Sequence, residues 1–334
     1  MTPREIFLAS LHRQPVPRRA TGSATSVVTT DLMDHAGVWF PEAHLDANKM
    51  VALSETAFTV LGFDNIMPLF SVWHESAALG CDVDWGDRSR MPTGKPCCPS
   101  LDADLAIPRD FLLRPPCKVS LEALRELKRR HGGEVAILGK AFGPWTLGYH
   151  VFGVEPFLMA TLLEPDAVKR ALRKLIEVTV AFANAQIDAG ADALTLADHC
   201  TRDLCSPDAY RDFLQELHHE LHERIPCPIV LHICGNTADR LGYLRETGLE
   251  CFHFDSKVPA PQARTLAGKK LSLMGGTSNF TVVRNGTTAS IAQDVKEKLA
   301  AGIDIIGPEC AVPLDAPWIN LQALAEEAKR QGAA

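Results

Sequence analysis

The chain has 334 residues, of which 46% are hydrophobic and 22% charged, and 34 Lys and Arg against 41 Asp and Glu give a formal net charge of −7. This composition is that of a globular protein and excludes a fibrous or disordered chain. The acidic balance, without a run of basic residues, argues against nucleic acid as a partner. No apolar stretch is long and uncharged enough to span a membrane, and the charged first twenty residues do not form a signal peptide, so we expect a cytoplasmic protein without a membrane partner.

The ten cysteines do not have the spacing of a disulfide framework. A chain of this length buries enough apolar surface to fold without cross-links, and a reducing compartment keeps thiols free. We therefore expect most of them, such as Cys117 and Cys251, to be small buried residues. Only cysteines whose neighbours indicate chemistry are treated as candidates for function.

The first predicted element is a helix at the N-terminus, where Thr2, Pro3 and Glu5 form a capping box with a proline at the first helical position. After it, short apolar runs alternate with segments of helical periodicity, including a long helix over residues 164–189 that ends before Gly190. The runs interpreted as strands are residues 25–28, 66–70, 135–138, 193–196, 228–231, 251–254, 271–274 and 303–306.

Eight strands that alternate with helices predict an α/β fold, a (β/α)8 TIM barrel with an N-terminal helical extension. Pro68 lies inside the second predicted strand, where a proline removes a ladder hydrogen bond, and is an objection to that strand. Residues 80–116 contain six prolines, including Pro99, and do not fit the alternation. We expect them to form an excursion of loops and a hairpin at one end of the barrel. Because no linker is visible, residues 1–334 are predicted to form one domain.

In a barrel of this kind the active site lies where the strands end and their loops begin. His232 and Cys234 lie at the end of the fifth predicted strand, Asp255 follows the sixth, and Cys310 follows the eighth. Residues i and i+2 of a strand face the same way, so His232 and Cys234 can point into one site. Two sulfurs and one nitrogen select a tetrahedral metal such as zinc, and three protein ligands with an exchangeable fourth position are typical of catalytic zinc.

Each candidate residue also has a purely structural interpretation. His232 can be a hydrogen-bonding residue at the barrel mouth, beside two inert cysteines. Asp198 also ends a strand, and a hydrogen bond at the barrel mouth is its structural alternative. Glu75 follows a strand together with Trp73 and His74, so these side chains can reach the same pocket, where Trp73 can pack on a flat ligand.

Two histidines on a predicted helix offer a second arrangement. His218 and His222 are four residues apart, so they share one helix face and could bind a metal. The neighbouring His219 and Glu220 favour a solvated face instead, and this is the structure that we expect.

Motifs along nearly the whole chain resemble those of the methylcobamide:coenzyme M methyltransferases, a branch of the uroporphyrinogen decarboxylase superfamily. Residues 30–37 and 40–44, residues 61–65, Glu75 and residues 79–81 resemble the opening segments of that branch. Residues 197–207 resemble its loop with an Ala-Asp-Pro start and a Gly-Asp-Leu continuation. The His-Ile-Cys-Gly of residues 232–235 and the Gly-Pro-Glu-Cys of residues 307–310 resemble its zinc-binding segments, a pair specific to the methyltransferase branch.

The resemblance implies a zinc-bearing barrel that accepts a methylated corrinoid from a corrinoid-carrying partner protein. It places Asp255 near the metal, where the family often has Glu, as a possible fourth ligand. His199 and Arg202 replace a proline and a small residue expected in the loop that begins at Asp198, which leaves the methyl acceptor open. The metal ligands that the resemblance implies are His232, Cys234 and Cys310.

The chemistry implied is attack by a small thiol, such as coenzyme M, on the methyl group of methyl-Co(III). A free thiol is mostly protonated at neutral pH, and zinc coordination removes its proton. Three alternatives stay open. The first is a demethylase that transfers a methyl from a methylated small molecule, such as an aryl methyl ether, to Co(I). The others are a uroporphyrinogen decarboxylase, whose arginine-rich motif is missing from residues 18–22, and a non-catalytic zinc- or corrinoid-binding protein.

Overall fold

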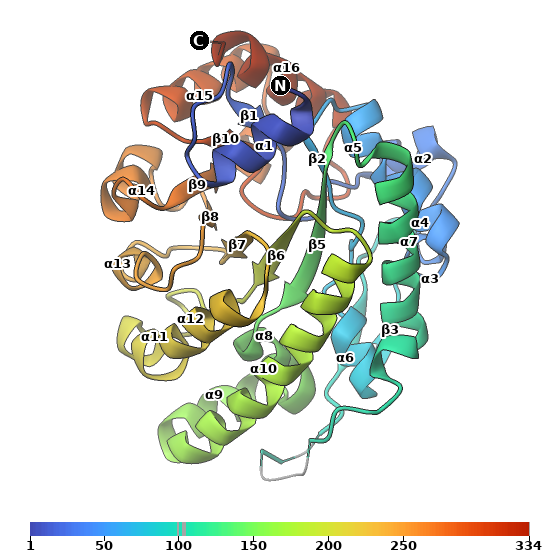
Figure 1. Ribbon diagram of the computed structural model, residues 1–334, viewed down its shortest axis with the longest axis vertical. Coiled ribbons are helices and arrows are strands. Elements are labelled where there is room, and N and C mark those ends of the chain that lie inside the picture. Colours follow the sequence, from blue (N-terminus) through green and yellow to red (C-terminus); the bar gives the residue numbers. More distant parts are fainter. Residues whose placement is uncertain (99, 102–104, 334) are drawn as a thin grey trace.

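The computed structural model describes residues 1–98, 100–101 and 105–333, and in it the predicted barrel is confirmed. Within these residues eight parallel strands form one sheet, in the order β1-β10-β9-β8-β7-β6-β5-β2, and helices surround it (Figure 1). The strands are β1 (Ala20–Thr21), β2 (Asn65–Ile66), β5 (Ala136–Phe142), β6 (Ala193–Ala197), β7 (Ile229–His232), β8 (Cys251–Phe254), β9 (Ser272–Gly275) and β10 (Ile305–Ile306).

The barrel is closed between β1 and β2 by a few hydrogen bonds rather than by a ladder. The amide of Asp64 donates to the carbonyl of Thr21 at 2.8 Å, and the Asp64 carboxylate accepts from the amide of Thr21 at 2.9 Å. Just beyond, the side chain of Asn65 exchanges two hydrogen bonds with the backbone of Ser23. Side chains therefore supply most of the closure at this seam.

The predicted N-terminal helix is α1, and its capping box is confirmed: the Thr2 hydroxyl accepts from the amide of Glu5, whose carboxylate accepts from the amide of Thr2. The predicted long helix over residues 164–189 is α10. The helices are α1 (Pro3–Leu11), α2 (Thr30–Ala36), α3 (Glu42–Leu45), α4 (Ala47–Ser54), α5 (Thr56–Thr59), α6 (His74–Leu79), η1 (Phe111–Leu113), α7 (Pro115–His131), α8 (Pro144–Phe152), α9 (Val154–Leu163), α10 (Pro165–Asp188), α11 (Pro207–Phe213), α12 (Gln215–Arg224), α13 (Leu241–Leu244), α14 (Ala260–Ala267), η2 (Asn279–Arg284), α15 (Thr288–Ala300) and α16 (Trp318–Gln331). None of those in the described residues combines the length and apolar character needed to cross a bilayer.

The first predicted strand, residues 25–28, is wrong. The strand lies earlier, at β1, where Ala20 and Thr21 pair with Ile305 and Ile306. Residues 25–28 form no strand and lie at the carboxyl end of the barrel, where Val28 is buried. The second predicted strand, residues 66–70, overlaps β2 only at Ile66, so Pro68 follows the strand and removes no ladder bond.

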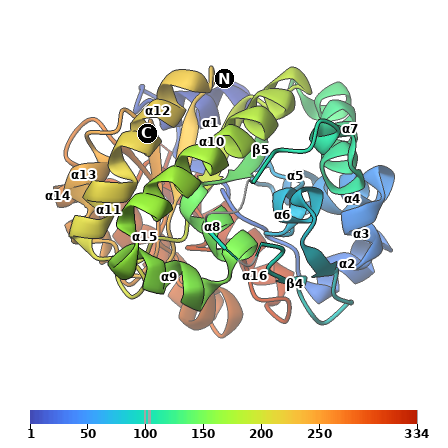
Figure 2. The ribbon, with the colours of Figure 1, turned by 90° about the horizontal axis from the view of Figure 1, so that it is seen from below.

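The excursion predicted for residues 80–116 contains the expected hairpin, formed by β3 (Asp82–Asp84) and β4 (Thr93–Lys95); Pro99 lies outside the described residues. Gly94 of β4 packs on the indole of Trp73, since a Cβ atom there would lie 2.5 Å from a ring carbon. On its other face the Trp73 ring stacks on His150 of α8, with 4.0 Å between ring centroids. The hairpin thus packs against α8 and the start of α6 (Figure 2).

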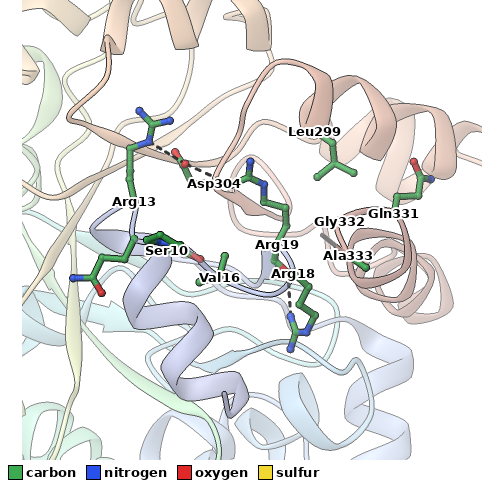
Figure 3. Close-up of a pocket in the computed structure, with 12 residues that line it drawn as sticks. Ser10, Arg13, Val16, Arg18, Arg19, Leu299, Asp304, Gln331, Gly332 and Ala333 are labelled. Atoms are coloured by element: carbon green, nitrogen blue, oxygen red, sulfur yellow. Dashed lines mark hydrogen bonds and ion pairs between the residues drawn. The ribbon is translucent and has the colours of Figure 1, made fainter.

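At the opposite end of the barrel, where the strands begin, buried aspartates are paired with basic side chains. Figure 3 shows one of these, Asp304, facing Arg13 and Arg19 beside a cavity of about 500 Å³. Arg13 lies 3.0 Å from Asp304 and has a φ of 55°, a left-handed conformation more typical of glycine at a helix end. The ion pair explains why an arginine is held at this position.

Candidate metal centre and substrate cavity

Three potential metal ligands converge at the carboxyl end of the barrel, as predicted. His232 is the last residue of β7, Cys234 lies two residues further, and Cys310 lies in the loop after β10. Their ligand atoms all lie within 4.8 Å of one another. The Sγ of Cys234 is 3.0 Å from Nε2 of His232 and 2.8 Å from Sγ of Cys310. One imidazole nitrogen and two sulfurs form a donor set that fits zinc.

A second histidine fixes the orientation and the tautomer of His232. His253 of β8 is fully buried, and its Nε2 lies 2.8 Å from the carbonyl of Pro308, which can only accept, so Nε2 carries the hydrogen. Burial lowers the pKa of His253 well below its usual value and keeps it neutral, so its Nδ1 accepts from Nδ1 of His232 at 2.7 Å. The lone pair of His232 is therefore on Nε2, which faces the two thiols.

The two thiols share a hydrogen bond that makes them unequal. This hydrogen bond lowers the pKa of Cys310 well below its usual value and raises that of Cys234. The loop that carries Cys310 is held by Asn279, at the start of the π-helical turn η2. The Asn279 side chain donates to the carbonyls of Cys310 and Ala311 at 3.1 and 2.8 Å. No motif in the sequence pointed to Asn279 or to His253.

Asp255 follows β8, next to the metal candidates, and binds backbone groups. One carboxylate oxygen accepts from the amide of Gly235 at 2.8 Å and the other from the amide of Lys257 at 2.9 Å. Among the described residues, the group of clustered ligand atoms consists of His232, Cys234 and Cys310 and does not include Asp255. The carboxylate therefore positions the residue that directly follows Cys234, and its predicted role as a fourth ligand stays a prediction.

The ligand group opens into a cavity of about 520 Å³. Its walls are mainly apolar and aromatic, and the hairpin contributes Met91 and Gly94 to them. The predicted residues Asp198 and His199 also line it. Burial lowers the pKa of His199, so this imidazole is neutral at pH 7. Further residues that line the cavity are Phe70, Trp73, Lys140, Phe142, Tyr149 and His150.

Asp198 directly follows β6 and is fully buried. Its two oxygens lie 2.8 Å from the amide of Thr146 and 3.0 Å from Nε2 of His218, and Nδ1 of His218 lies 2.8 Å from the hydroxyl of Tyr210. The expectation that His218 lies on a solvated helix face is therefore wrong: it is fully buried because it partners the Asp198 carboxylate. The structural alternative for Asp198, a hydrogen bond at the barrel mouth, is present in the structure.

Glu75 lies behind the cavity wall, at the start of α6. One carboxylate oxygen accepts from the amide of Phe142 at 2.8 Å, while Oε2 is buried without a hydrogen-bond partner in the described part of the chain. Burial raises the pKa of Glu75 to about 7. The nearby Lys140 of β5 does line the cavity. The sequence showed it only as an interruption of an apolar run, although a lysine inside a buried strand is itself a signal of function.

The family model described as Uroporphyrinogen decarboxylase (URO-D) matches residues 2–331, and the chain belongs to this family. A methylated-thiol–coenzyme M methyltransferase of Methanosarcina mazei is 30% identical over 98% of this chain and 89% of its own length. The methylcobamide:CoM methyltransferase MtaA of Methanosarcina barkeri is 30% identical over 95% of both chains. A solved methyltransferase from Methanosarcina mazei is 29% identical, covers 99% of both chains and superimposes with a TM-score of 0.95. The family assigned from the sequence motifs is thus confirmed.

Proposed function

We propose that this protein is a zinc-dependent methyltransferase that moves a methyl group between a methylcobamide, carried by a corrinoid protein, and a small thiol such as coenzyme M. The observation that carries the proposal is the convergence of His232, Cys234 and Cys310 at the edge of an apolar cavity. The names of relatives that cover nearly the whole chain support it.

The proposed transfer balances without a further reactant. The carbon–cobalt bond breaks and leaves its electron pair on cobalt as Co(I), a carbon–sulfur bond forms, and the thiol proton is released. Zinc held by His232, Cys234 and Cys310 would supply the Lewis acidity that lowers the pKa of a thiol bound beside them. His253 keeps the lone pair of His232 directed at the metal site, and Asp255 holds the loop of Cys234 through Gly235.

The cavity walls present mainly apolar surface to the reacting sulfur and the methyl group. Phe70, Phe142 and Tyr149 surround the space with apolar surface, and the stacked pair of Trp73 and His150 forms one side. A dry cavity strengthens the electrostatic interactions inside it. Asp198 and His199 line the same space and are the candidates for contact with the rest of the substrate.

The aromatic walls also support a second candidate function. Phe70 and Phe142 offer apolar surface to a flat ring, such as that of an aryl methyl ether, while both faces of the Trp73 indole are already covered by Gly94 and His150. In this reaction the methyl would move from the ether oxygen to Co(I), in a demethylase rather than a thiol methyltransferase. The two functions share the metal site and differ in the direction of transfer with respect to cobalt.

One experiment tests both. Purified protein is mixed with free methylcobalamin and a panel of thiols, and separately with Co(I) cobalamin and aryl methyl ethers, and the absorbance of methyl-Co(III) is followed. We expect thiol-dependent loss of methyl-Co(III) and about one zinc per chain. Protein without zinc would contradict the proposal, and gain of methyl-Co(III) from the ether alone would select the second function.

A further inference from the structure

The hairpin of β3 and β4 is flanked by two cysteines that contact each other. Cys81 directly precedes β3, Cys97 lies two residues after β4, and Asp82 and Lys95 pair at the end of the antiparallel ladder between them. The Sγ of Cys81 donates a hydrogen bond to the Sγ of Cys97 at 2.9 Å, and both residues are free thiols. The fold thus brings together two thiols at the base of the hairpin that are 16 positions apart in the sequence.

Contacts with the backbone of α8 fix the position of both cysteines. The amides of Cys97 and Cys98 donate to the carbonyl of Val151 at 3.1 and 2.9 Å. The Sγ of Cys81 lies 3.6 Å from the carbonyl of the preceding residue in this helix, His150. Because both ends of the hairpin are attached to the same helix, the fold itself sets the distance between the two sulfur atoms.

The two thiols differ in exposure and in acidity. Cys97 is exposed, whereas Cys81 is buried. The hydrogen bond from Cys81 lowers the pKa of Cys97 to about 7, so about half of this thiol is ionised at neutral pH. The same hydrogen bond, together with burial, raises the pKa of Cys81 above its usual value. In thiol–disulfide exchange a thiolate is the nucleophile, and a second thiol beside it can resolve the mixed disulfide that it forms.

The other cysteines are less accessible to a dissolved reactant. All ten cysteines lie in the described part of the chain, and Cys97 is the exposed one among them. The neighbouring Cys98 is buried and has a different partner, since its Sγ donates to the carbonyl of Ser100 at 3.2 Å. Burial raises the pKa of five more thiols and keeps them protonated: Cys117, Cys200, Cys205, Cys227 and Cys251.

We propose that Cys97 and Cys81 form a modification site for low-molecular-weight disulfides, in which Cys97 attacks, Cys81 resolves, and the product is an intrachain disulfide across the base of the hairpin. In the first step the Cys97 thiolate attacks one sulfur of the small disulfide RSSR, whose S–S bond breaks so that one thiolate leaves. In the second step Cys81 gives up its proton and attacks the Cys97 sulfur, which releases the second thiolate. Two protein thiols are oxidised, one RSSR is reduced to two RSH, and the two thiol protons pass to the released molecules.

The modification site borders the substrate cavity without sharing its metal candidates. Pro96, which directly precedes Cys97, lines the cavity together with Met91, Gly94 and His150. A bond between Cys81 and Cys97 closes residues 82–96 into a loop and restricts the conformations of this part of the wall. The inference does not depend on the proposed function, because none of its steps uses a metal or a corrinoid.

The test treats the reduced protein with 2-hydroxyethyl disulfide at pH 7, labels the remaining thiols after denaturation and maps the peptides by mass spectrometry. We expect the wild type to yield the peptide of Cys81 linked to the peptide of Cys97, and dithiothreitol should restore both thiols. Cys234 and Cys310 lie on other peptides, so oxidation at the candidate metal site is read separately. Since Cys97 and Cys98 are adjacent, variants assign the link between them.

Three serine variants separate the roles of the cysteines. Cys97→Ser should form no link. Cys81→Ser should stop after the first step and keep a hydroxyethylthio group on Cys97, because the serine hydroxyl can still donate a hydrogen bond to the attacking sulfur. Cys98→Ser is the matched control and should form the link as fast as the wild type does.

Three results would overturn the inference: a wild type that forms no link, a link that persists in Cys97→Ser, or a mixed disulfide on Cys97 that accumulates in the wild type as it does in Cys81→Ser. The first and third are read on the wild type alone, so the test holds even if a variant does not fold.

Discussion

The two ends of the barrel differ in whether their buried charged and polar groups have partners. Where the strands begin, each of three buried aspartates has at least two basic partners within 4.0 Å: Arg18 and Lys329 at Asp64, Arg4 and Lys128 at Asp192, and Arg13, Arg19 and Arg264 at Asp304. Where the strands end, Oε2 of Glu75 and both ring nitrogens of His74 are buried without partners in the described residues, and Lys140 has one carbonyl. Paired charges hold the strand starts together, while at the strand ends Oε2 of Glu75 and the ring of His74 are left without partners among the described residues, behind a cavity that Lys140 lines.

The largest effect on activity should come from removal of a thiol where the strands end. Cys234→Ala should reduce the zinc content from about one per chain to near zero and abolish methyl transfer, because two ligands do not hold a catalytic zinc. The barrel should remain folded, since its large core does not depend on the metal. Metal analysis and circular dichroism provide the measurements. The matched control is Cys227→Ala, two residues before β7, which should keep both zinc and activity.

The second largest effect, on the free energy of unfolding, should come from an aspartate where the strands begin. Asp304→Ala removes the partner of Arg13 and Arg264 and an acceptor for the amide of Leu273. Breaking such a buried pair should lower the free energy of unfolding by about 3 kcal/mol. Urea unfolding measures the loss, and KM for the thiol should not change because the opposite end of the barrel is untouched. A variant as stable as the wild type would show that these ion pairs do not carry the stability assigned to them.

A substitution at Asp255 tests whether its carboxylate only positions the loop of Cys234 or also binds the metal. Asp255→Ala frees the amide of Gly235 next to Cys234, so zinc should bind about 10–100-fold more weakly, as measured by competition with a chelator. If the carboxylate is also a fourth ligand that a thiol displaces, thiol affinity should rise or stay similar. A clearly lower melting temperature with unchanged thiol affinity would exclude the ligand role and leave Asp255 a positioning residue.

The smallest effect on the site itself concerns the unpartnered carboxyl of Glu75, which changes stability with pH. Burial raises its pKa to about 7 from an ordinary value near 4.5, so between these pH values the folded state holds a proton that the unfolded state has lost. The free energy of unfolding should therefore fall as the pH rises from about 4.5 to 7, by roughly 3 kcal/mol, and then level off. Glu75→Gln should remove this part of the dependence. Urea unfolding at pH 5 and pH 8 compares the two proteins, and parallel curves would contradict the assignment.

The sequence predicted the barrel and the convergence of the ligand group because both follow from local rules. Apolar runs mark buried strands, and residues just after parallel strands meet at one end of the sheet, so His232, Cys234 and Cys310 could be brought together without a structure. The first strand was misplaced because β1 is only two residues long and its position is set by pairing with Ile305 and Ile306, far along the chain.

The polar groups around the site were harder to predict for a related reason. The burial of His218 depends on which face of α12 turns toward Asp198, and the helix pattern alone allowed a solvated face. His253 is one of four residues in an apolar strand, and nothing local shows that its ring meets His232 on the neighbouring strand. Contacts between strands that are distant in sequence decide such roles.

The hairpin of β3 and β4 has a consequence for how this family can change over evolutionary time. Its Met91 and Gly94 form part of the cavity wall, yet the segment belongs to an excursion and not to the strands that carry His232 and Cys310. Replacement of this one segment alters the shape offered to an incoming molecule while the ligand group keeps its geometry. Insertions and exchanges within residues 82–95 can therefore reshape the cavity wall while His232, Cys234 and Cys310 keep their places on the barrel.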